Sequence, residues 1–184
     1  MRSAAYVLVG FLLVLLQSIL YRFWAPLVPL QPFGFPLSRL TLGITPNLVL
    51  PLVLFLAVQE PSLARGSLLS FCLGWGIDVI GGGPAYLYRF TMVAVWWFTR
   101  MVSARVSMQT LASRIPLAFV GSLLESFIVL TLLAIFGPDA QRPVELSVQV
   151  LPRAITTTLF APLIFSLAAR IQLESRPQAS SQTS

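Results

Sequence analysis

The sequence predicts an all-α, polytopic integral membrane protein with about six transmembrane helices. Of its 184 residues, 57% are hydrophobic and only 10% are charged, and the mean hydropathy is +0.85. A soluble domain carries roughly 25% charged residues because its surface faces water. The apolar residues also form long uncharged blocks, and about 20 such residues suffice to cross a bilayer as a helix.

Charge and residue usage exclude several classes of function. All twelve basic residues are arginines, and most lie at the ends of apolar blocks rather than on one face, which argues against nucleic-acid binding. The chain has no histidine and a single cysteine, Cys72. Histidine-based metal sites, Ser–His nucleophile pairs and an internal disulfide are therefore excluded, and no Gly-rich phosphate loop is visible. We expect no catalytic residue, no metal and no cofactor.

Six apolar blocks mark the expected spans within a single transmembrane domain over residues 1–172. The first resembles a signal peptide, but no small-x-small cleavage site follows, which favours a retained helix. The spans are predicted at 3–21, 42–59, 62–80, 85–102, 115–136 and 154–169. Glu145, Gln149 and Arg153 recur every four residues, which suggests an early start of the last helix with one wet face outside the membrane. Residues 173–184 are expected to form a disordered cytoplasmic tail.

The segments between the spans contain prolines that exclude or end helices and arginines that indicate which side of the membrane each segment faces. Four prolines between residues 25 and 40 exclude a helix there and predict an aromatic-rich outer loop, either a docking surface or a plug on the protein's own helices. Glu60-Pro61 ends the second span. With six spans, seven arginines fall on the side of the N-terminus and five on the other side, which favours both termini in the cytoplasm.

The fourth span contains two arginines that are too close together for both to lie outside the membrane. Only ten residues separate Arg89 from Arg100, or about 15 Å of helix, against a hydrocarbon core of about 30 Å. One of them is expected to lie inside the bilayer, to snorkel, or to find a partner.

The third span carries the most regular pattern. Small or polar residues recur at strict four-residue intervals, which places them on one ridge of a helix: Ser62, Gly66, Ser70, Gly74, Asp78 and Gly82. Such a ridge lets another helix approach closely. An internal helix–helix seam is favoured, and a seam for a partner protein or a ligand cavity is the alternative.

Two carboxylates lie within the predicted spans. Asp78 is followed by the turn Gly81-Gly82-Gly83-Pro84, which would fold Arg89 back beside it, so the two are candidates for an ion pair. Glu125 lies near mid-bilayer, with small residues around it. It is expected to serve as packing or polar contact, with a proton or substrate site as the alternative.

The segment Thr45-Pro46-Asn47-Leu48-Val49-Leu50 and the later run from Gly74 to Pro84 resemble the rod shape-determining protein MreD family. That family shows a Pro-Asn or Pro-Asp dipeptide opening an apolar helix, and then a tight cytoplasmic turn with one or two charged residues, here Glu60 and Arg65. A glycine-spaced helix follows, which ends in Asp, two or three apolar residues and a Gly-Gly-Pro or Gly-Ser-Pro turn. The likeness covers about residues 41–90. This chain departs from the pattern at Ala85-Tyr86, where the family often has Leu-Gly.

The resemblance implies a non-enzymatic subunit of the bacterial inner membrane within the cell-elongation complex. It would bind the single-span protein MreC and help couple MreB filaments to the peptidoglycan synthases, RodA and a class B penicillin-binding transpeptidase. The family's architecture is also similar to the substrate-binding subunits of energy-coupling-factor transporters. A vitamin-type transporter subunit is therefore the alternative, with Asn47, Asp78, Arg89 and Glu125 as its pocket residues.

Overall fold

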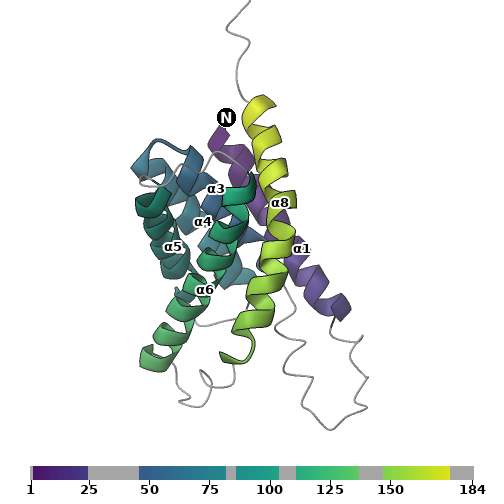
Figure 1. Cartoon of the computed structure of the whole chain (residues 1–184), viewed down its shortest axis with the longest axis vertical. Helices are drawn as coiled ribbons and strands as arrows, with labels where there is room; N and C mark the ends of the chain where they lie inside the picture. The colour runs from purple at the N-terminus through teal and green to yellow at the C-terminus, as the bar shows by residue number, and fades with distance from the viewer. Residues whose placement is uncertain (1, 25–45, 82–85, 104–110, 137–146, 175–184) are drawn as a thin grey trace, which may run out of the picture.

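The computed structural model describes residues 2–24, 46–81, 86–103, 111–136 and 147–174, and within these ranges its regular secondary structure is helical (Figure 1). The helices are α1 (Arg2–Trp24), α3 (Val49–Gln59), α4 (Leu63–Gly81), α5 (Leu87–Ser103), α6 (Leu111–Phe136) and α8 (Val150–Glu174). Three described helical stretches are long and apolar enough to cross a membrane: Leu63–Ile80, Arg114–Phe136 and Val150–Gln172. The predicted all-α class and the potential to span a membrane are thus confirmed.

The helices form one bundle in which the start of α1 and the end of α8 lie at the same end (Figure 1). Each helix overlaps one of the predicted spans. The last span was predicted to begin at residue 154, but the helix begins earlier, at Val150, and it continues to Glu174. The four-residue polar spacing before the span had suggested such an early start. Leu173 and Glu174 are therefore helical rather than part of a disordered tail, and residues 175–184 lie outside the described ranges.

The second predicted span is wrong in its extent. We expected a helix over 42–59, but α3 begins at Val49, and residues 46–48 are not helical. Eleven residues rise only about 16 Å, roughly half of the hydrocarbon core. The late start has a local cause, because Asn47 is a strong helix-capping residue, and Pro51 is tolerated only because it falls within the first turn.

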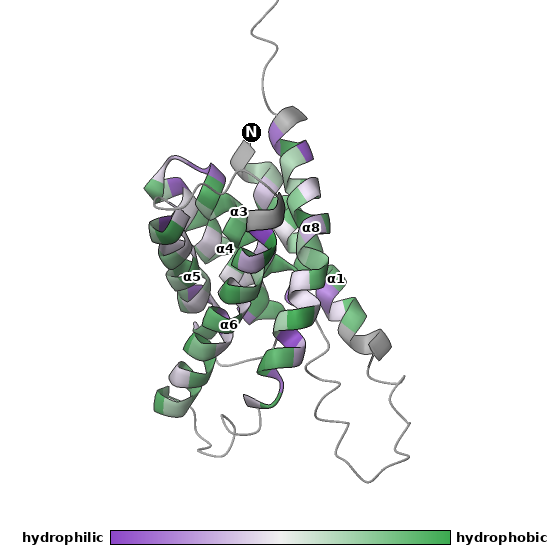
Figure 2. Cartoon of the chain, viewed as in Figure 1, coloured by the Kyte–Doolittle hydropathy of each residue, from purple (hydrophilic) through white to green (hydrophobic). Residues whose placement is uncertain are grey.

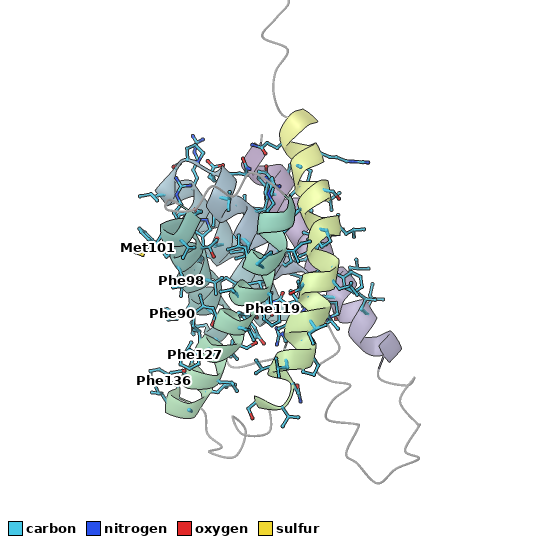
Figure 3. All side chains as sticks on the ribbon, in the orientation of Figure 1. Phe90, Phe98, Met101, Phe119, Phe127 and Phe136 are labelled. Atoms are coloured by element: carbon cyan, nitrogen blue, oxygen red, sulfur yellow. The ribbon has the colours of Figure 1, made fainter. Side chains whose placement is uncertain are left out.

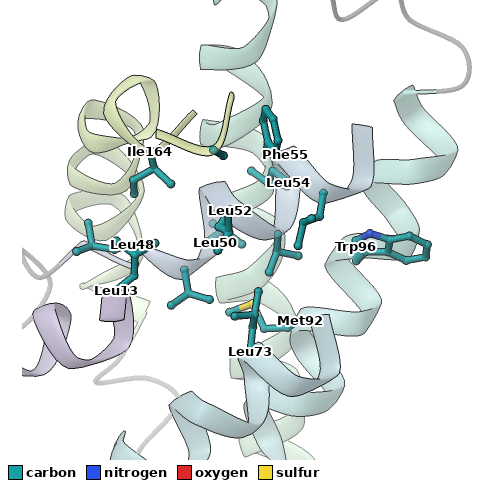
Figure 4. Packing of buried hydrophobic residues seen from close by; sticks show 14 of the residues in the cluster. Leu13, Leu48, Leu50, Leu52, Leu54, Phe55, Leu73, Met92, Trp96 and Ile164 are labelled. Atoms are coloured by element: carbon teal, nitrogen blue, oxygen red, sulfur yellow. The ribbon is translucent and has the colours of Figure 1, made fainter. Parts of the chain in front are cut away.

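Helix α3 is the centre of the bundle. Every residue from Val49 to Ala57 is buried, and the helix packs against α1, α4, α5, α6 and α8. Figure 4 shows its leucines among side chains from several neighbouring helices, including Leu73, Trp96 and Ile164. A helix that is apolar on all sides is expected in such a fully enclosed position.

The outer faces of the surrounding helices are apolar as well (Figure 2). Phe90, Phe98 and Met101 project outward from α5, and Phe127 and Phe136 do so from α6 (Figure 3). A water-soluble protein rarely exposes apolar patches of this extent. An apolar exterior around an apolar core is the arrangement of a protein solvated by lipid.

The glycine-spaced ridge of α4 packs against α5 inside the same chain. A methyl group at Gly66 would collide with the Trp96 indole, and one at Gly74 would come within 2.6 Å of the Tyr88 carbonyl oxygen. Ser70 is fully buried between them, and its hydroxyl donates to the Gly66 carbonyl at 2.9 Å. The predicted internal seam is thus present at these positions.

The two ends of the ridge differ from its middle. The Ser62 hydroxyl accepts a hydrogen bond from the Arg65 backbone N–H at 3.4 Å, so Ser62 caps the start of α4. Gly82 and Pro84 lie outside the described residues. The seam is therefore established for the middle of the ridge, with Asp78 at its far end.

Candidate functional site

The first site is the start of α3, where the chain enters a helix inside the bundle. The first N–H groups of a helix have no partner within it and need one from elsewhere. The Asn47 side-chain oxygen accepts from the N–H groups of Val49 and Leu50 at 3.2 and 3.3 Å. Pro51, the next residue, has no N–H to satisfy.

Other helices supply the remaining partners at this helix start. The Asn47 N–H donates to the Thr157 hydroxyl of α8 at 3.0 Å, and the Leu48 N–H donates to Gln17 Oε1 of α1 at 3.2 Å. Every backbone donor from Asn47 to Leu50 therefore has an acceptor. The helix start is buried without an orphan N–H group because three separate segments converge on it.

Glu125 of α6 lies beside this helix start and is 1% exposed. Its Oε1 accepts a hydrogen bond of 2.7 Å from Asn47 Nδ2 and another of 3.1 Å from Arg153 Nη2 of α8. The Tyr88 side chain of α5 interacts with the same guanidinium. We call Asn47, Glu125, Arg153 and Thr157 the α3 junction. The polar contact expected for Glu125 is therefore present.

The sequence did not identify Arg153 as the partner of Glu125. Its four-residue spacing with Glu145 and Gln149 indicated a wet face outside the membrane, and for Arg153 this expectation is wrong. Its guanidinium turns inward to the carboxylate, and its side chain is only 25% exposed. The signal that could have found it was the need of a buried carboxylate for a cation.

The second site joins the end of α4 to the start of α5. Asp78 Oδ1 accepts from the Tyr88 N–H at 2.9 Å, and Oδ2 accepts from the Arg89 N–H at 3.3 Å. These are the second and third residues of α5, whose N–H groups have no partner within that helix. Tyr86, just before α5, has a φ of 73°, and the carboxylate of another helix takes over the capping role.

The ion pair expected between Asp78 and Arg89 is present in the same place. Arg89 Nε lies 3.2 Å from Asp78 Oδ2, and the guanidinium lies 4.6 Å from the centre of the Tyr86 ring. Opposite charge and the face of an aromatic ring both favour a guanidinium that is largely withdrawn from water. Asp78 thus binds a helix start and a side-chain cation at once.

Arg100, the other arginine of the fourth span, is also partnered. Its Nη1 donates to the Ala57 carbonyl oxygen at 3.1 Å, and its Nη2 donates to that of Pro61 at 3.4 Å. A cation at the C-terminus of α3 opposes the negative end of the helix dipole. Arg89 and Arg100 thus both have partners within the protein. Finding a partner was one of the three outcomes expected for an arginine of this span.

No family model, no curated protein and no solved structure matches this chain. Among the described residues, no group of three or more Asp, Glu, Cys or His side chains is placed to hold a metal ion. Asp78 and Glu125 each accept N–H donors from other segments and pair with an arginine, an arrangement that fixes helix ends relative to one another.

Proposed function

We propose that this chain is a non-enzymatic, multi-pass subunit of the bacterial inner membrane that acts as a scaffold in the cell-elongation complex. In this proposal the six helices of the described ranges take part in crossing the membrane, and both termini lie in the cytoplasm. The chain binds a single-span MreC-like protein and helps couple MreB filaments to RodA and its class B penicillin-binding transpeptidase. The resemblance over residues 41–90 supplies the partners.

One observation carries the choice of a scaffold over a transporter. Asn47, Asp78, Arg89 and Glu125 are the residues that a substrate pocket would need. In the structure they fall into the α3 junction and the second site, which joins the end of α4 to the start of α5. In both places the carboxylate contacts an arginine and N–H donors of its own chain. Polar groups that pair with one another rigidify a fold, and a substrate could reach the atoms that form these pairs only by breaking them.

The resemblance and the geometry meet in two residues. Asn47 belongs to the Pro-Asn dipeptide of the resemblance, and Asp78 is the aspartate that precedes its glycine–proline turn by two apolar residues. Each of them caps the start of a helix, α3 and α5 respectively. Residues of this kind define a rigid shape, and a rigid membrane body is what a partner-binding scaffold presents.

Affinity purification of the tagged full-length chain from native membranes tests the proposal. Recovery of a single-span MreC-like protein, together with elongation-complex components, is the expected result. A matched preparation of an Asp78→Ala variant serves as a control, because it should lose these partners in proportion to its loss of folded protein. Recovery of an ATPase pair with a bound vitamin would overturn the scaffold and establish the transporter alternative.

A further inference from the structure

Three polar atoms in and next to the Glu125–Arg153 pair have no hydrogen-bond partner among the described residues. They are Glu125 Oε2, Arg153 Nε and Ser122 Oγ. Glu125 and Ser122 are almost completely buried. Ser122 precedes Glu125 by three residues on α6, and side chains at this spacing lie on the same face of a helix. All three atoms therefore belong to one region, the α6–α8 side of the α3 junction.

The chemistry of the three atoms restricts what can satisfy them. A carboxylate oxygen accepts hydrogen bonds, a guanidinium Nε–H donates, and a hydroxyl does both. The ligand must therefore donate and accept. It must also be neutral, because Glu125 and Arg153 already balance each other's charge and a further buried charge would have no counterion. Water is the smallest molecule with these properties, and buried waters typically make about three such bonds.

We propose that Glu125 Oε2, Ser122 Oγ and Arg153 Nε bind a structural water molecule that links α6 to α8 beside the start of α3. The water donates a hydrogen bond to Glu125 Oε2, while Oε1 of the same carboxylate already accepts from Asn47 and Arg153. Trp96 Nε1 is also buried without a partner, but it is a single donor and packs on Gly66. The inference does not depend on the partners proposed above.

The sign of a stability change tests this site. Removing a buried hydroxyl that is truly unpaired stabilises a protein, whereas removing one that binds a water destabilises it. We expect Ser122→Ala in the full-length protein to lower the melting temperature by about 2–4 °C, the shift typical of losing one good hydrogen bond in a chain of this size. Ser122→Val, which fills the space of the water, should lower it further.

Ser70→Ala is the matched control, because it removes a buried hydroxyl that is bonded within its own helix. A smaller shift for this control than for Ser122→Ala is expected. A melting temperature for Ser122→Ala equal to or above that of the parent protein would overturn the proposal.

An experimental density map that resolves ordered waters supplies an independent test. A peak within hydrogen-bonding distance of Glu125 Oε2 and Ser122 Oγ, lost in Ser122→Val, is the expected result. A map with ordered waters elsewhere and none here would contradict the proposal. So would a peak that gains density when Rb⁺ replaces Na⁺ in the buffer, because that ligand would be a cation.

Discussion

Asp78 and Tyr88 belong to different helices, yet the carboxylate of one caps the backbone of the other, with 2.9 Å between Asp78 Oδ1 and the Tyr88 nitrogen. The same carboxylate holds Arg89. Asp78 is therefore both an ion-pair partner and the cap of α5, and these two roles respond differently to substitution.

Exchanging the two charges separates the roles of Asp78. If the ion pair were its whole contribution, the double variant Asp78→Arg, Arg89→Asp would recover the stability lost in Asp78→Arg alone. An arginine at position 78 cannot accept from the N–H groups at 88 and 89, so we expect the double variant to remain substantially destabilised. Thermal unfolding of the three variants in detergent measures this. Full recovery would reduce Asp78 to an ion-pair partner.

The contact between Asp78 and Arg89 could be predicted from the sequence, whereas the pairing of Glu125 with Arg153, which joins distant segments, could not. The four-residue spacing on α4 and the glycine–proline turn placed Asp78 near Arg89, because both signals act within a few turns of chain. The pairing of Glu125 with Arg153 spans 28 residues and left no periodic trace. Which residues pair between two such helices depends on how the helices pack, and this packing cannot be read from the composition of either helix.

The extent of α3 shows the same limit. Residues 42–59 are apolar, and hydropathy responds alike to burial in lipid and burial in protein. Hydropathy therefore predicted a full span where the structure has a short helix enclosed by five others. The capping preference of Asn47 is the local signal that could have shown where this helix begins, but the prediction rested on hydropathy alone.

The Glu125–Arg153 pair should show strong coupling in a double-mutant cycle. Removing one partner leaves a buried charge without compensation, which typically costs about 3–5 kcal/mol. We expect Glu125→Leu and Arg153→Met each to destabilise by an amount in this range, and the double variant to lose much less than their sum. Denaturant unfolding of the four proteins measures the coupling. Additive losses would mean that the two groups do not depend on each other.

Arg100 should stabilise the end of α3 through both of its hydrogen bonds. Arg100→Lys keeps the charge but loses the two-armed geometry, and we expect a loss of about 1 kcal/mol in the free energy of unfolding. Arg100→Leu should lose about 2–3 kcal/mol, because the carbonyl oxygens and the helix dipole lose a charged donor. Arg65→Leu, at an exposed position, is the control and should change stability by less than either. Equal losses at positions 65 and 100 would mean that the bonds from Arg100 to the end of α3 do not stabilise the protein.

Gly74 and Gly76 offer a comparison within one helix that tests the α4–α5 seam. A methyl group at Gly74 would lie within 2.6–2.9 Å of the backbone of Tyr88 and Arg89, whereas at Gly76 its nearest neighbour would be Val14 Cγ2 at 3.8 Å. Backbone cannot move aside as a side chain can, so Gly74→Ala should push α5 away and disturb the Asp78 cap. We expect a loss of about 1–3 kcal/mol for Gly74→Ala, the usual cost of overpacking.

Gly76→Ala should be neutral or slightly stabilising, because alanine favours the helix and the space is open. The two variants have the same change in composition and the same change in intrinsic helix propensity. Their difference in unfolding free energy therefore isolates the contact with α5. Equal stabilities would mean that the ridge of α4 does not pack on α5 as closely as described, and the capping geometry of Asp78 would fail with it.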